Sequence, residues 1–208
     1  MKGKPAMKQL FTTILITYLL TISSFAMSDQ LQQKNKNPSQ RTKQQNEIYL
    51  QHLKYEYGNR GRTFIGMSKA AKYAAGSDLE NFFQAYYEME IINQKILNHM
   101  KDELEVDYEA NWFVRCGLNV MTYLGWRFVS PQQLIDIIIP YIPKLEEMGS
   151  LSNPEHKLFF AYIVAQEKTQ LDASRAAQQE GWDSGAKVFR DFLPQAEAEL
   201  QRLLNTID

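Results

Sequence analysis

One short pattern occurs twice in this chain and constrains its fold more than any other feature. The copies read Phe82-Phe83, six residues, Glu90, two residues, Asn93, and Phe159-Phe160, six residues, Glu167, two residues, Gln170. In each copy a carboxylate and an amide are one helical turn apart, behind an aromatic pair that we expect to be buried. A buried carboxylate is costly unless another group pairs with it, so the repeat predicts two related helices with polar groups in the interior.

The rest of the chain also has a helical hydrophobic period, and no convincing alternating strand pattern is present. Ser130-Pro131 with Gln133 forms a capping box with proline at the first helical position. We therefore expect an all-α fold with helices near 45–74, 78–104, 108–128, 131–148, 154–179 and 184–206. Gly58 and Gly61 could divide the first helix into two pieces, at a cost of about 1 kcal/mol each. Pro140 and Pro143 are expected to kink or end the fourth.

The N-terminal region indicates export. In residues 1–26 three lysines precede an apolar run that ends at Ser24-Phe25-Ala26, which is typical of a secretory signal peptide. The run is too short for a comfortable membrane span of about 20 residues, so we expect no stable membrane anchor. Residues 27–45 are almost all polar and predict a disordered tether. Residues 46–208 then form a single helical-bundle domain in a periplasmic or secreted protein.

Charge and cysteine content narrow the partners and the source of stability. The whole chain has 23 basic and 24 acidic residues, and removal of residues 1–26 takes away three lysines and leaves a net charge of 20 minus 24, or −4. This mildly acidic balance argues against a nucleic-acid partner. Cys116 is the single cysteine and cannot form an intrachain disulfide, so the core must hold the fold.

Four acids fall on four of the expected helices. Glu90 and Glu167 lie within apolar stripes, Glu56 shares a face with Tyr49 and Leu53, and Asp136 interrupts an isoleucine-rich run. We expect these acids to meet inside the bundle.

The stretch from Glu56 to Leu97, with Ser68-Lys69-Ala70, a turn at Gly76 and Glu-x-x-Asn at Glu90, resembles the first half of a ferritin-like protein of the rubrerythrin type. The resemblance implies a four-helix core with an extra crossover helix at 108–128 and a C-terminal helix. In that family glutamates and Glu-x-x-His pairs point inward onto two metal ions. The metal ligands implied here are Glu56, Glu90, Asn93, Asp136, Glu167 and Gln170, and the implied cofactor is two iron or manganese ions. Because Asn93 and Gln170 replace histidines, and amide oxygens are weaker ligands for these ions, the motifs are degenerate and a chain without a cofactor is favoured.

Two interpretations of the buried acids remain open. They could bind metal, or they could form a satisfied polar network without metal, bonded to Arg60, Arg62 or Tyr86. The first predicts a di-metal carboxylate oxidoreductase acting on oxygen, peroxide or a small substrate. The second predicts a binding or interaction module for a protein or small molecule in the periplasm. An immunity or adaptor protein is a further alternative, based on size, export and helicity.

Overall fold

Helices make up all the regular structure in the described part of the chain. The computed structural model of the protein describes residues 42–104, 106, 122–123 and 125–206. Its α-helices are α2 (Lys43–Tyr73), α3 (Glu80–Glu103), α5 (Pro131–Ile138), α6 (Ile142–Leu151), α7 (Lys157–Glu180) and α8 (Trp182–Thr206), with 3₁₀ helices η2 (Trp126–Phe128) and η3 (Pro154–His156). No strand occurs among these residues, and the expected all-α bundle is confirmed.

Helix α2 is continuous through both of its central glycines. Gly58 is buried and Gly61 half-buried, so this part of the helix packs against its neighbours, and packing outweighs the low helix propensity of glycine. The helix starts at a capping box in which the Thr42 side chain accepts from the Gln45 amide. Residues 43–45, expected to be the end of the tether, are therefore helical.

The segment expected as one helix at 131–148 is two helices. Helix α5 ends at Ile138 and α6 begins at Ile142, so the break spans Pro140, while Pro143 lies in the first turn of α6, where proline is tolerated. The capping box at the start of α5 is confirmed: the Gln133 amide donates to Ser130 Oγ at 3.3 Å, and the Ser130 amide donates to Gln133 Oε1 at 2.9 Å.

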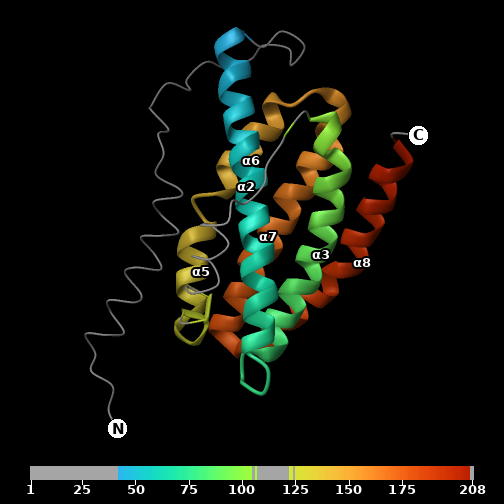
Figure 1. Ribbon diagram of the computed structural model, residues 1–208. Coiled ribbons are helices and arrows are strands. Elements are labelled where there is room, and N and C mark those ends of the chain that lie inside the picture. Colours follow the sequence, from blue (N-terminus) through green and yellow to red (C-terminus); the bar gives the residue numbers. More distant parts are fainter. Residues whose placement is uncertain (1–41, 105, 107–121, 124, 207–208) are drawn as a thin grey trace.

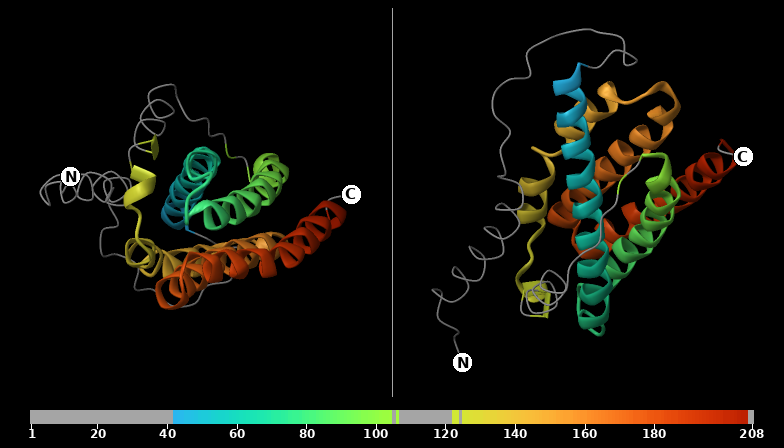
Figure 2. Two further views of the ribbon diagram at one scale, coloured as in Figure 1. Left: turned by 90° about the horizontal axis from the view of Figure 1, so that it is seen from below. Right: turned by 45° about the horizontal axis from the view of Figure 1, so that its top comes forward.

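The long helices form two antiparallel pairs, α2 with α3 and α7 with α8 (Figure 1). Helix α8 also packs against α3, and α5 and α6 pack one after the other along α7. Seen along the bundle, the α2–α3 pair lies against the α7–α8 pair (Figure 2). Helices α2 and α7 are not among the closely packed pairs, and only a few contacts join α2 to α6. Side chains must therefore bridge the interior between α2 and α7.

The apolar core confirms the burial expected of both aromatic pairs. Phe82, Phe83, Phe159 and Phe160 are at most 2% exposed and belong to one cluster of buried side chains. Helix α8 contributes Phe189 to the same cluster, and Phe189 stacks on Tyr86 with ring centroids 4.8 Å apart. The C-terminal helix is thus part of the core.

Several expectations fall outside the described residues. They are the signal peptide at 1–26, most of the tether and most of the expected crossover helix at 108–128. Among the described helices, none combines the length and the apolar character that crossing a membrane requires.

Candidate functional site

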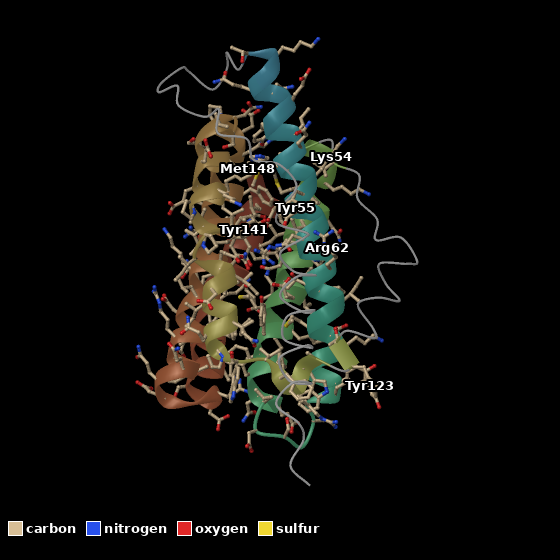
Figure 3. All side chains as sticks on the ribbon, turned by 90° about the vertical axis from the view of Figure 1, so that its left-hand side faces the viewer. Lys54, Tyr55, Arg62, Tyr123, Tyr141 and Met148 are labelled. Atoms are coloured by element: carbon tan, nitrogen blue, oxygen red, sulfur yellow. The ribbon has the colours of Figure 1, made fainter. Side chains whose placement is uncertain are left out.

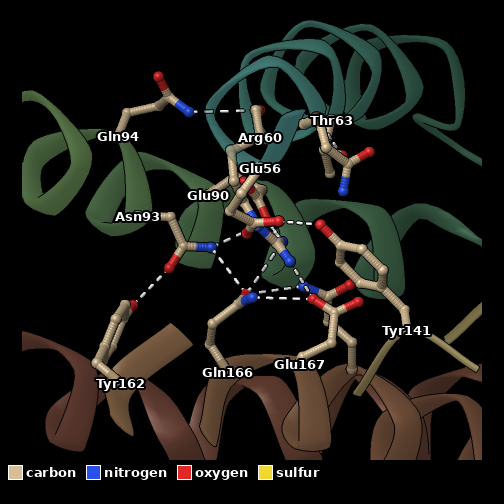
Figure 4. Close-up of polar contacts among 12 residues, drawn as sticks. Glu56, Arg60, Thr63, Glu90, Asn93, Gln94, Tyr141, Tyr162, Gln166 and Glu167 are labelled. Atoms are coloured by element: carbon tan, nitrogen blue, oxygen red, sulfur yellow. Dashed lines mark hydrogen bonds and ion pairs between the residues drawn. The ribbon is translucent and has the colours of Figure 1, made fainter. Parts of the chain in front are cut away.

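Polar side chains from three helices meet in the interior of the bundle. We call this group the Arg60 cluster; its members are Glu56, Arg60, Glu90, Asn93, Gln166, Glu167 and Gln170 (Figure 4). Helix α2 supplies the first two, α3 the next two and α7 the last three. None is more than 4% exposed, so the cluster is closed to bulk solvent.

The Arg60 guanidinium is the centre of the cluster. Its Nε donates to Glu56 Oε1 at 2.7 Å, one helical turn away, and its Nη2 donates to Glu167 Oε2 on α7. Its Nη1 lies 3.5 Å from Glu90 Oε1 on α3. One cation therefore joins three carboxylates on three helices, in charge-assisted contacts of the kind that are strongest in a dry interior.

The amide side chains connect the carboxylates to one another. Asn93 Nδ2 donates to Glu90 Oε1 at 3.0 Å and to Gln166 Oε1 at 3.1 Å. Gln166 Oε1 also accepts from Arg60 Nη1 at 3.2 Å and from Gln170 Nε2 at 2.7 Å, while Gln166 Nε2 donates to Glu167 Oε2 at 2.9 Å. Gln166 is the residue through which the two repeated motifs make contact.

Three tyrosine hydroxyls complete the edge of the cluster. Tyr141, on the link between α5 and α6, donates to Glu56 Oε2. Tyr162 donates to Asn93 Oδ1 and Tyr86 to Gln170 Oε1, both at 2.5 Å. Burial, together with nearby carboxylates, raises the pKa of all three hydroxyls, so they remain neutral donors at neutral pH.

The charges of the cluster do not balance. Burial alone would lower the pKa of Arg60, but Glu167, Glu56 and Glu90 raise it well above its ordinary value, so Arg60 is a cation. Burial is the main cause that raises the pKa of Glu90 to about 7, and it raises the pKa of Glu167 as well. Glu90 Oε2 is buried without a hydrogen-bond partner. Three carboxylates face one cation, and Glu90 is the one that holds a proton most readily near neutral pH.

Five of the six residues predicted as metal ligands come together in the cluster, and Asp136 does not. Asp136 is exposed and accepts from Gln132 Nε2 at 2.6 Å. Its neighbours Ile135 and Ile138 are the buried residues of α5, and a residue next to an inward one on a helix points elsewhere. The expectation that four acids converge is therefore wrong for Asp136 and confirmed for the other three.

The network partners considered from the sequence are also divided by the structure. Arg60 and Tyr86 bond to the cluster, whereas Arg62 is half-buried with its guanidinium carbon 5.9 Å from the centre of the Tyr55 ring. Figure 3 views this side of the bundle, with Tyr55 and Arg62 on α2 and Tyr141 opposite.

Sequence reasoning missed Gln166, Tyr162 and Tyr141. Tyr162, Gln166 and Gln170 follow each other in steps of four, so helical spacing could have placed the first two on the face of the cluster. Tyr141 follows the break at Pro140, and no periodic pattern fixes its direction.

The donor set does not match the pair of metal ions that the ferritin-like resemblance implies. The space that the three carboxylates share is taken by the Arg60 guanidinium, a cation of the chain itself. Within residues 42–104, 106, 122–123 and 125–206, no three histidine, cysteine, aspartate or glutamate side chains are grouped so that they could hold a metal ion. The assignment of the six residues as metal ligands stays a prediction, and the observed geometry supports a polar network centred on Arg60.

Comparisons with known proteins add no family to this description. No protein-family model matches the chain, and neither the curated proteins nor the solved structures contain a match. The kinship with ferritin-like proteins therefore remains a proposal based on the residues between Glu56 and Leu97.

Proposed function

We propose that this chain is an exported helical-bundle protein that works as a periplasmic binding or interaction module on a degenerate ferritin-like scaffold. The single observation that carries the proposal is the position of the Arg60 guanidinium between Glu56, Glu90 and Glu167. A guanidinium at this place supplies the positive charge that the carboxylates require. The cluster then serves as structure, and the function belongs to the outer surface.

The burial of the cluster supports this assignment. Glu56 and Arg60 are 1% exposed, Glu90 is fully buried and Glu167 is 4% exposed. A catalytic group must touch its substrate, and a site that accepts a molecule from solvent is normally concave and open. The three carboxylates have neither an open face nor a free position on their shared cation.

The hydrogen bonds support it as well. Arg60 contacts all three carboxylates, and both side-chain oxygens of Glu56 accept bonds, one from Arg60 and one from Tyr141. A buried polar network that is nearly satisfied fixes the relative positions of its helices. Here it fixes α2, α3 and α7 and thereby gives the module a rigid exterior.

The di-metal oxidoreductase is the second candidate, because three carboxylates do converge from three helices. The two functions differ in metal content and in the effect of removing charge. Glu90→Gln with Glu167→Gln leaves the buried pair of Arg60 and Glu56, which is neutral. A module held by a polar network is expected to stay folded and to keep its stability or gain some, since replacing buried charges is often neutral or stabilising.

The experiment is elemental analysis of the protein purified from the periplasm, followed by titration with iron, manganese and zinc and an assay of peroxide turnover. The proposal predicts no copurified metal, no saturable binding and no turnover for the natural chain and for the double variant. Glu180→Gln with Glu197→Gln, two exposed acids on α7 and α8, is the matched control.

A metal-loaded natural chain that turns over peroxide, and that loses both the metal and the turnover in the Glu90→Gln, Glu167→Gln variant, would establish the oxidoreductase instead. An envelope partner captured by photo-crosslinking in cells is expected to bind the double variant as well as the natural chain, because the substituted groups are internal. The immunity or adaptor protein is a special case of this module, and identification of that partner distinguishes it.

A further inference from the structure

The interior between α2, α3 and α7 has the composition of a cation site. Four side-chain oxygens face the Arg60 guanidinium: three carboxylate oxygens, from Glu56, Glu90 and Glu167, and the amide oxygen Gln166 Oε1. Carboxylate and amide oxygens are the ligands that hard divalent cations prefer. The set comes from three helices, so it surrounds its occupant.

We infer that the centre of the Arg60 cluster is a cation site whose resident is the chain's own guanidinium, and that it binds one divalent cation, such as Mn²⁺, once that guanidinium is removed. The inference rests on the proposed function, in which the natural chain holds no metal at these residues. It goes further in assigning Arg60 the role of an internal replacement for a bound ion, with Gln166 as a fourth ligand.

A second observation points to a ligand independently of the ion pairs. Glu90 is fully buried, and its Oε2 has no hydrogen-bond partner although its Oε1 contacts both Asn93 and Arg60. Buried oxygens of native proteins almost always have a partner. The free oxygen of Glu90 is a donor atom that the guanidinium does not use and that a small spherical ion at the same place can reach.

Charge favours the exchange. With Arg60 in place, three carboxylates share one positive charge, so the cluster already carries an excess of acid. Without Arg60 the same carboxylates have no cation in a dry interior, which is a strongly unfavourable state. A divalent ion supplies one more positive charge than the guanidinium and compensates the three acids better.

Space permits the exchange too. Arg60 is among the largest fully buried side chains of the described residues, and α2 and α7 are not among the closely packed helix pairs. Truncation to alanine therefore opens a polar cavity between them. Polar cavities of this size take up water, which can fill the remaining coordination positions of an ion.

The test uses the full chain with Arg60→Ala. Binding of Mn²⁺ is followed by loss of the electron paramagnetic resonance signal of the free ion, and stability by the thermal midpoint with Mn²⁺ or with a chelator. We expect the variant to bind roughly one Mn²⁺ per chain and to gain thermal stability with it, because a ligand that binds only the folded state stabilises that state. The natural chain is expected to show neither effect.

Two further variants make the result specific. Arg175→Ala removes an exposed arginine of α7, whose Nη1 lies 3.5 Å from Asp172, and is expected to behave as the natural chain does. Addition of Glu90→Gln to Arg60→Ala removes one charged ligand and is expected to weaken Mn²⁺ binding at least tenfold. If Arg60→Ala does not fold with a chelator, the inference predicts that it folds when refolded with Mn²⁺.

The inference is overturned if Arg60→Ala binds no Mn²⁺, whether it is folded or fails to fold in both conditions. It is also overturned if Glu90→Gln leaves the affinity of Arg60→Ala unchanged, since the ion would then be bound elsewhere. A natural chain that binds Mn²⁺ at the cluster would contradict the proposed function as well. An Arg60→Ala chain that ignores Mn²⁺, beside a natural chain that also ignores it, contradicts this inference alone.

Discussion

Arg60 and Glu167 lie 107 positions apart in the chain, and their side chains form a buried ion pair that joins α2 to α7. The two helices have no close backbone packing, so this pair and its neighbours provide the link between them. The arginine that joins the first half of the bundle to the second is thus also the cation that compensates its buried acids.

Removal of Arg60 is expected to be strongly destabilising. Without added metal, Arg60→Ala should lower the free energy of unfolding by about 3–5 kcal/mol, because it leaves buried carboxylates uncompensated. Arg175→Ala, which breaks an exposed pair with Asp172, should cost less than about 1 kcal/mol. Urea denaturation in the presence of a chelator measures both values. Equal losses for the two variants would mean that Arg60 does not support the interior.

Acid is expected to stabilise the fold through Glu90. Its pKa rises from an ordinary value of 4.5 to about 7, mainly through burial, so between these values the folded chain holds a proton that the unfolded chain has released. The free energy of unfolding therefore falls as the pH rises through this window. The contribution is fully present below about pH 4.5 and lost above about pH 7, and it amounts to about 3 kcal/mol. The raised pKa of Glu167 acts in the same direction.

Denaturant unfolding at several pH values between about 5 and 8 checks this dependence. Glu90→Gln has no proton to release, so its stability should vary much less over the same range than that of the natural chain. Glu197→Gln, at an exposed position of α8, should keep the full dependence. A Glu90→Gln variant with an unchanged slope would show that another group is responsible.

The hydroxyl of Tyr141 is expected to contribute to stability through Glu56. Tyr141→Phe removes the donor to Glu56 Oε2 and leaves that buried oxygen without a bond, at a cost of about 1–3 kcal/mol. Tyr123 is 61% exposed, and Tyr123→Phe should change the free energy of unfolding by less than about 0.5 kcal/mol. Thermal or urea unfolding compares them, and similar small effects would count against a structural bond between Tyr141 and Glu56.

Two glycine substitutions are expected to have opposite effects. A Cβ at Gly185 would lie 2.6 Å from the Ala173 carbonyl oxygen and 2.9 Å from the Phe82 ring, so Gly185→Ala should separate α8 from α7 and cost about 1–3 kcal/mol. A Cβ at Gly66 would meet only Thr122 Oγ1, at 4.0 Å. Gly66→Ala should therefore stabilise α2 by up to about 1 kcal/mol. Calorimetry of both variants checks the signs, and a stable Gly185→Ala would refute the close approach of α7 and α8.

Much of the interior could be predicted from the sequence because helical spacing is a local property. The repeated motif placed Glu90 and Asn93 on the inner face of α3 and Glu167 and Gln170 on that of α7, and all four are buried. The proline break and the capping box at Ser130 depend on neighbouring residues only, and both predictions are confirmed.

The features that were missed depend on contacts between distant parts of the chain. Spacing alone could not tell whether the acids face a metal ion or Arg60, since that depends on how α2 lies beside α7. Asp136 was wrongly placed inside because the apolar run around it gave no direction, and the packing of Ile135 and Ile138 turns it outward. Tyr141 reaches Glu56 only because the chain turns between α5 and α6.

The central claim is that a guanidinium stands among the buried carboxylates as their cation. A crystal structure at neutral pH tests it most directly, with protein expressed in medium rich in iron and manganese and anomalous diffraction measured at both absorption edges. The account predicts planar density for Arg60 between Glu56, Glu90 and Glu167, and no anomalous peak within the Arg60 cluster. Anomalous peaks at ligand distance from Glu90 and Glu167, with Arg60 displaced from them, would contradict it.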